Sequence, residues 1–168
     1  SELVRRGVVQ VMEGRHCFAH LTIEENLLTG AYTRSDKGEI AANLDKVYAY
    51  FPRLKTRRLS QAGYTSGGEQ QMTAVGRALM AKPSMILLDE PLAGMGQAEA
   101  RKMVDLVASL KKGRAVLVVE HDMDAVFELA DRLTVMADGH VIASGLPQDV
   151  LRAPTTDRLK SFLARHLR

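Results

Sequence analysis

The sequence predicts an α/β fold with a mostly parallel sheet and a helical subdomain inserted into it. Apolar runs of strand length alternate with segments whose apolar residues recur at helical spacing, and this alternation is typical of parallel sheets. The first third of the chain carries mainly helical patterns instead. The sequence has 168 residues, with no internal repeat and no low-complexity linker, and this length fits a single domain.

The first elements are a short strand and a capped helix. The apolar run Val8–Met12 predicts a buried strand. Thr22 and Glu25 have the spacing of a capping box, in which the threonine caps the helix and the glutamate reaches back to it. Gly30 is suited to end this helix.

Two longer helices are predicted next. The first covers Asp36 to Phe51 and ends at Pro52, because proline does not continue a helix. A basic, irregular stretch follows at 53–58, and the second helix covers Ser66 to Ala81. The apolar residues expected on the buried faces are Ile40, Leu44, Val47, Tyr48 and Phe51 in the first helix, and Met72, Val75, Gly76 and Leu79 in the second.

The second half of the chain alternates clearly between strands and helices. Ser84–Asp89 and Ala115–Glu120 are predicted to be buried strands, each followed by an amphipathic helix. Asp138-Gly139 separates two further strands, 133–137 and 140–144, and is a strong signal for a tight hairpin. Pro147 suits the first turn of a further helix. The apolar stripes of the helical segments are Met103, Leu106, Val107 and Leu110; Met123, Val126, Phe127 and Ala130; and Leu159, Phe162, Leu163 and Leu167.

Composition excludes several classes of protein. Hydrophobic residues make up 46% and charged residues 26% of the chain, which is ordinary globular usage and unlike that of a disordered protein. A single cysteine, Cys17, excludes an intrachain disulfide, and no apolar run reaches the roughly 18 residues of a membrane-spanning helix. The net charge of +3 is too small to indicate nucleic-acid binding by itself. We expect a cytoplasmic protein with no nucleic-acid partner.

Two adjacent carboxylates follow an apolar strand. Asp89 and Glu90 stand where the run Met85–Leu88 ends, and ligands of open α/β sheets bind at the carboxyl ends of the strands. Pro91 is expected to keep Glu90 extended. One carboxylate could hold Mg²⁺ while the other polarises an attacking water; two solvated acids in a turn are the alternative.

Two further motifs could bind phosphate. Ser66, Gly67 and Gly68 open a helix, where exposed amides and the helix dipole favour an anion, although an ordinary glycine turn before a capped helix has the same pattern. His121 follows the strand Ala115–Glu120, where it could contact a phosphate or position a water, or serve only as a turn residue.

Taken together, these motifs resemble the ATP-binding subunit of an ABC transporter. Thr65–Gln71 resembles the signature loop of that family, Met85–Glu90 resembles its Walker B strand with the catalytic glutamate, and His121 falls at its switch histidine. The resemblance covers nearly the whole chain. Within the family, the segments 13–27 and 67–71 are similar to ATP-binding subunits of importers for branched-chain amino acids or urea.

The resemblance implies two catalytic residues, Glu90 and His121, and one metal ligand, Asp89. Asp89 would hold Mg²⁺, Glu90 would polarise the attacking water, and His121 would contact the γ-phosphate of ATP.

It also implies contacts with partner subunits. Two ATPase subunits would pair head-to-tail, and each signature loop would complete the ATP site of the other. Transmembrane permease subunits would hold the protein on the inner face of the cell membrane. The implied nucleotide-binding residues are Ser66, Gly67, Gly68, Glu69 and, at the Q-loop, Glu13, which would also sense Mg²⁺ and contact the permease.

The resemblance fails at the phosphate-binding loop. The family motif Gly-x-x-x-x-Gly-Lys-Ser/Thr needs a Gly-Lys pair, and this sequence has none. We therefore interpret residues 1–168 as a single ABC ATPase domain lacking its N-terminal part, with a partial P-loop NTPase (RecA-like) core. Residues 1–12 and 77–168 would form the core, and 13–76 the Q-loop and helical subdomain. Such a truncated chain is expected to be inactive alone, which leaves open whether it is an enzyme.

Two other functions are compatible with this sequence. A non-catalytic remnant that acts as a scaffold is favoured by the missing phosphate-binding loop. A DNA-repair-type ABC ATPase shares the signature loop and the Walker B strand, but it separates them with long coiled coils, and the sequence predicts none here.

Overall fold

The computed structural model describes residues 2–14, 16–152, 154 and 156–166. The chain forms two compact units, Ser1–Val119 and Glu120–Arg168, and each is described by itself. The expected division into 1–12 with 77–168 and 13–76 stays a prediction.

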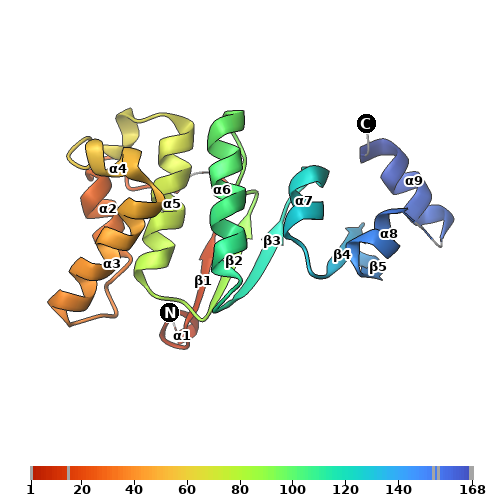
Figure 1. Ribbon diagram of the computed structural model, residues 1–168, viewed down its shortest axis with the longest axis horizontal. Coiled ribbons are helices and arrows are strands. Elements are labelled where there is room, and N and C mark those ends of the chain that lie inside the picture. The colour runs from red at the N-terminus through yellow and green to blue at the C-terminus, as the bar shows by residue number, and fades with distance from the viewer. Residues whose placement is uncertain (1, 15, 153, 155, 167–168) are drawn as a thin grey trace. The chain divides into compact units, whose positions relative to one another are not determined.

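The first unit is built on a parallel sheet of three strands (Figure 1). The strands are β1 (Val8–Val11), β2 (Met85–Asp89) and β3 (Ala115–Val119), and β2 lies between the other two. Val11 is level with Leu88, and Asp89 is level with Val119. All three strands were predicted to within one residue at each end, so their apolar runs were sufficient to locate them.

The prediction that Ala115–Glu120 is a buried strand is wrong. Leu117 and Val119 are 49% and 56% exposed, whereas Ile86 and Leu88 in β2 are 0% and 1% exposed. Successive side chains of a strand point to opposite faces of the sheet. In the described part of the chain, the helices cover the face that carries Ile86 and Leu88, and the opposite face of β3 stays open.

The helical subdomain of the first unit packs around one long helix. The helices of this unit are α1 (Glu2–Arg5), α2 (Ile23–Thr29), α3 (Lys37–Tyr50), α4 (Pro52–Thr56), the 3-10 turn η1 (Ala62–Tyr64), α5 (Gly67–Met80) and α6 (Gln97–Leu110). Helices α2, α3 and α4 contact α5, which in turn contacts β1. A β-carbon on Gly76 would lie 2.8 Å from Leu27 Cδ2 and 2.9 Å from Val47 Cγ1, so glycine allows α5 to approach α2 and α3 closely.

Local signals account for the ends of these helices, with one exception. Thr22 and Glu25 form the predicted capping box, and Gly30 ends α2. Helix α3 ends before Pro52 as expected. However, the stretch 53–58 is not irregular as predicted, because Pro52 starts the short helix α4. A proline in the first helical turn loses no hydrogen bond and already has the helical φ angle.

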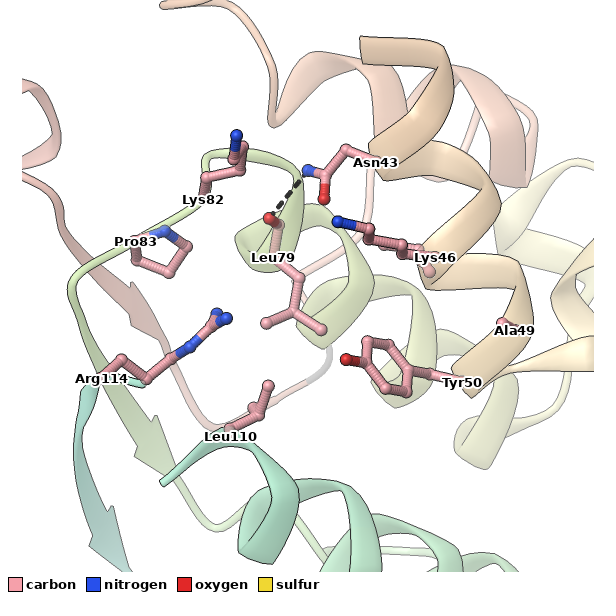
Figure 2. Close-up of a pocket in the computed structure, with 10 residues that line it drawn as sticks. Asn43, Lys46, Ala49, Tyr50, Leu79, Lys82, Pro83, Leu110 and Arg114 are labelled. Atoms are coloured by element: carbon pink, nitrogen blue, oxygen red, sulfur yellow. Dashed lines mark hydrogen bonds between the residues drawn. The ribbon is translucent and has the colours of Figure 1, made fainter. Parts of the chain in front are cut away.

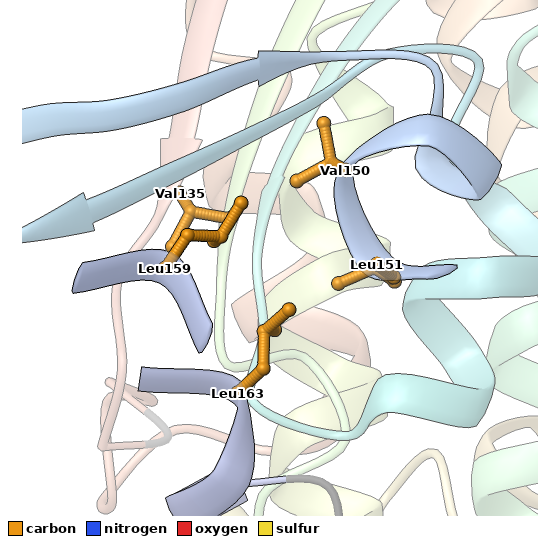
Figure 3. Packing of buried hydrophobic residues seen from close by; sticks show 5 residues of the cluster. All are labelled: Val135, Val150, Leu151, Leu159 and Leu163. Carbon is orange, nitrogen blue, oxygen red and sulfur yellow. The ribbon is translucent and has the colours of Figure 1, made fainter. Parts of the chain in front are cut away.

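The second unit is a hairpin covered by short helices. It contains α7 (Met123–Leu129), β4 (Leu133–Ala137), β5 (His140–Gly145), α8 (Pro147–Arg152) and α9 (Asp157–His166). Asp138 and Gly139 have φ angles of 51° and 75°, and a tight hairpin turn needs positive φ at both positions. The antiparallel hairpin is therefore confirmed. Figure 3 shows its small core, which consists of Val135, Val150, Leu151, Leu159 and Leu163.

The expected apolar stripe of α7 is partly wrong. Ala125 and Leu129 are the buried residues of this helix, whereas Phe127 is exposed and packs under the guanidinium of Arg152. Asp122 accepts hydrogen bonds from the amides of Asp124 and Ala125, and this cap fixes where the helix begins. Of the stripe expected in the last helix, Leu159 and Leu163 are buried. The side chain of Phe162, and Leu167 as a whole, lie outside the described residues.

Candidate functional site

Three predicted site residues gather at one edge of the sheet. Because the strands are parallel, their carboxyl ends lie together. Glu13 stands two residues after β1, and Asp89 ends β2 and is followed by Glu90. Glu13 is exposed, whereas Asp89 and Glu90 are half-buried. The sheet thus brings together three carboxylates that are 76 and 77 positions apart in the sequence.

Glu90 occupies a strained turn. Its φ angle is +44°, which is rare for a residue other than glycine, so the prediction that Pro91 keeps Glu90 extended is wrong. The amide of Glu90 donates to the carbonyl of Val119 at 2.9 Å, and the amide of Ala93 donates to the carbonyl of Glu90 at 3.1 Å. These bonds outweigh the preference set by Pro91. Residues held in such conformations cluster at functional sites.

The carboxylate of Asp89 is suited to be a ligand of Mg²⁺. Among the described residues, its carboxylate has neither a hydrogen-bond partner nor an ion pair. Mg²⁺ usually takes one or two carboxylates and completes its shell with water and substrate phosphates. In the described part of the chain, no group of three or more His, Cys, Asp or Glu residues is placed to hold a metal. A site here would therefore depend on the nucleotide for its other ligands.

The predicted signature loop, Thr65–Gln71, contains the N-cap and the first turn of α5. The Ser66 hydroxyl accepts a hydrogen bond from the amide of Glu69 at 3.2 Å, and the carboxylate of Glu69 accepts one from the amide of Ser66 at 2.8 Å. Ser66 was predicted as the cap, and the reciprocal bond to Glu69 completes a capping box. The loop also lies against the start of α6, because a β-carbon on Gly68 would collide with the carboxylate of Glu99.

Glu69 is the most enclosed charged residue of this loop. Its side chain is 0% exposed, and it pairs with Arg53 Nε at 2.7 Å and with Arg57 Nη1 at 3.3 Å. Burial alone would raise the pKa of Glu69, but the hydrogen bonds from Arg53 and from Ser66, and the charge of Arg57, outweigh burial and lower it. The carboxylate of Glu69 is therefore charged and held within the protein.

Arg53 and Arg57 were not predicted as part of the site. They lie at i and i+4, with Arg53 in the first turn of α4 and Arg57 directly after its last residue, and this helix was not predicted. Both arginines reach the same carboxylate, so α4 is tied to the start of α5. The spacing of the two arginines after Pro52 is the signal that could have identified them. The predicted contact of Glu69 with a nucleotide stays a prediction.

His121 belongs to the second unit, so its contact with a phosphate stays a prediction. Its side chain is 73% exposed. The carboxylate of Glu120 accepts hydrogen bonds from the amides of His121 and Asp122, at 3.0 and 3.2 Å. Glu120 therefore holds the backbone of this turn, and its Oε2 lies 3.8 Å from Nδ1 of the exposed His121 ring.

Comparison with known proteins identifies the family. The family model described as ABC transporter matches residues 1–93. The chain belongs to this family. It is 41% identical over 143 residues to the high-affinity branched-chain amino acid transport ATP-binding protein BraG of Pseudomonas aeruginosa, a match that covers 84% of this chain and 61% of that protein.

Other ABC proteins show the same relationship. Identity is 32% over 166 residues with the glutamate/glutamine/aspartate/asparagine transport ATP-binding protein BztD of Rhodobacter capsulatus, covering 98% of this chain and 63% of that protein. A crystal structure of the ADP conformation of an ATP-binding cassette of an ABC transporter has a TM-score of 0.77 at 30% identity, covering 95% of this chain and 70% of that one. The chain thus spans less than two thirds of the length of BraG and of BztD, and it has the ABC ATPase fold. In the described residues, no helix is long and apolar enough to cross a membrane.

Proposed function

We propose that this protein is the ATP-binding subunit of an ABC importer for branched-chain amino acids. The observation that carries the proposal is the identity of 41% with the branched-chain subunit, against 32% with the subunit for acidic amino acids and their amides. The edge of the sheet that carries Glu13, Asp89 and Glu90 supports it, because the family resemblance places the ATPase residues there.

The chemistry follows from the positions of the strand-end carboxylates. Bound Mg²⁺ would neutralise charge on the phosphates of ATP. Asp89 offers a carboxylate without a described partner as one ligand, and Glu90 would hold and polarise the attacking water at the end of β2. Glu13 would sense the metal from the end of β1.

The signature loop would act on a second subunit. We propose a head-to-tail dimer, in which Ser66, Gly67 and Gly68 present hydroxyl and amide groups to the γ-phosphate held by the other copy. Permease subunits in the membrane would bind the helical subdomain and keep the protein on the cytoplasmic face. The tie from Arg53 and Arg57 to Glu69 supports this arrangement, because it links that subdomain to the loop.

A chimeric protein tests this function. The residues of BraG that precede its match to this chain are joined to residues 1–168, and the chimera is expressed in Pseudomonas aeruginosa lacking BraG. We expect leucine uptake to return, and we expect the Glu90→Gln chimera, as the matched control, to be produced at the same level without restoring uptake. A folded chimera that hydrolyses ATP but restores no uptake would contradict the assigned substrate. A folded chimera that does not bind Mg-ATP would contradict the ATPase assignment.

A further inference from the structure

A hollow of about 490 Å³ lies in the first unit between α3, the turn before β2 and the turn before β3. Pockets for small ligands usually have volumes of 300 to 1,000 Å³. Figure 2 shows the side chains that surround it. The hollow is at the amino ends of β2 and β3, whereas Asp89 ends β2 and Glu90 follows it, about 13 Å along the strand at 3.3 Å per residue. It is therefore separate from the proposed ATPase site.

The lining of this hollow is apolar and basic. Its apolar wall consists of Val47, Tyr50, Leu79, Pro83 and Leu110, and its basic residues are Lys46, Lys82 and Arg114. The described residues that line it include neither Asp nor Glu. Lys82 Nζ lies 2.5 Å from Glu39 Oε1, so Lys82 already has an ion pair with a residue outside the lining. Lys46 and Arg114 have no ion pair within the described chain.

Arg114 carries a polar atom that needs a partner. Its Nε atom is buried and has no hydrogen-bond partner among the described residues. In Figure 2 the guanidinium of Arg114 points into the space between Leu79, Pro83 and Leu110. A buried donor without a partner costs free energy, and an anion in the hollow would remove that cost. The planar fork of arginine is suited to carboxylates and phosphates.

Capping of the neighbouring helix does not account for these two cations. Basic residues near a helix C-terminus often bind its last carbonyls. At the end of α5, Asn43 Nδ2 already donates to the carbonyls of Leu79 and Met80, both at 3.1 Å, and Arg34 Nη2 donates to the carbonyl of Ala81 at 2.8 Å. Lys46 and Arg114 are therefore left facing the hollow without this role.

We propose that this hollow binds a small organic anion, with its carboxylate or phosphate on Arg114 and Lys46 and its apolar body against Leu79, Leu110 and Tyr50. The two cations select a negative group. A zwitterionic amino acid is disfavoured, because its ammonium would lie beside them. The inference does not depend on the proposed function, since it rests only on the lining of the hollow.

Calorimetric titration of the 168-residue chain tests the ligand class. The first probe is 4-methylpentanoate, which has both a negative charge and an alkyl chain. The other two are 4-methylpentanamide, which has the alkyl chain without the charge, and inorganic phosphate, which has the charge without the alkyl chain. We expect 4-methylpentanoate to bind about tenfold or more tightly than either of the others. A parallel titration with 3-methylbutyl phosphate shows whether the site prefers a carboxylate or a phosphate. Equal binding of the acid and the amide, or no saturation by either alkyl anion at millimolar concentrations, would overturn the proposal.

Two variants locate the bound anion. Lys46→Met and Arg114→Met are each expected to weaken binding of the preferred anion about tenfold. Lys102→Met, which removes an exposed cation of α6 outside the lining, is the matched control and is expected to bind as the parent does. Lys46 is exposed, so its variant keeps the test valid even if Arg114→Met folds poorly. Unchanged affinity in a folded Lys46→Met chain would overturn the assignment of Lys46, and unchanged affinity in both variants would overturn the site.

Discussion

Glu69 and Glu90 are acidic residues of the same unit, but they differ in burial, in their partners and in backbone conformation. Glu69 is fully buried, paired with two arginines and bonded to the Ser66 amide. Glu90 is half-buried and stands in a left-handed turn after β2. The contacts of Glu69 stabilise a loop. The left-handed backbone of Glu90 instead lowers the stability of the fold, and it holds a carboxylate at the edge of the sheet. The comparison separates a carboxylate that positions other groups from one that we propose to act on the attacking water.

Removing the Glu69 carboxylate is expected to have the largest effect on stability. Glu69→Ala leaves Arg53 and Arg57 without their partner and the Ser66 amide without its acceptor. We expect a loss of about 3 kcal/mol in the free energy of unfolding, measured by urea denaturation. Glu25→Ala is the matched control, because Glu25 has the same place in a capping box but is exposed and has no arginine partner among the described residues. Equal losses in the two variants would show that the arginines contribute nothing.

Removing one of the two arginines is expected to have a smaller effect. Arg53→Met deletes the 2.7 Å bond to Glu69 and leaves the 3.3 Å bond from Arg57 in place. The unfolding free energy should therefore fall by less than in Glu69→Ala. The double variant with Arg57→Met should lose more than the sum of the single variants, because only then is the buried carboxylate unpaired. If the losses in unfolding free energy were additive in the same urea titrations, the two arginines would not compensate for each other in pairing with Glu69.

Relieving the strain at Glu90 should change stability in the opposite direction. Glycine adopts positive φ at little steric cost, whereas alanine does not. We expect Glu90→Gly to be more stable than Glu90→Ala by about 1 kcal/mol in the same assay. Both variants lack the Glu90 side chain, so the difference reports the backbone alone. If Glu90→Ala proved as stable as Glu90→Gly, the turn would not be strained.

The smallest expected effect is on pH dependence. The folded state lowers the pKa of Glu69, so this residue contributes stability above its unfolded pKa of 4.5 and loses it as the pH falls through the lower, folded value. Glu69→Gln cannot titrate. The unfolding free energy of the parent should therefore fall more steeply below pH 4.5 than that of the variant. Parallel curves in this range would mean that Glu69 has an ordinary pKa in the folded protein.

The sequence predicted those features that local patterns determine. The three strands, the cap at Ser66, the Thr22–Glu25 box and the Asp138-Gly139 turn each depend on a few neighbouring residues. The exposed face of β3 depends instead on which helices cover the sheet. The left-handed Glu90 depends on a hydrogen bond from its amide to Val119 in the next strand.

In the candidate site, too, some residues could be predicted from local sequence and others could not. Asp89 and Glu90 could be recognised from a strand followed by two acids. The pairing of Glu69 with Arg53 and Arg57 could not, because it joins residues 16 and 12 positions apart through the packing of α4 on α5. Neighbouring residues alone do not specify that packing.

Hydrolysis of ATP by the purified chimera with BraG tests most directly whether Glu90 is the reacting carboxylate. The measurement compares Mg-ATP affinity and phosphate release for the parent chimera and its Glu90→Gln variant. We predict equal affinity and a turnover at least about 100-fold lower in the variant, because an amide cannot polarise water as a carboxylate does. A Glu90→Gln chimera that binds Mg-ATP and releases phosphate at the parent rate would contradict the account.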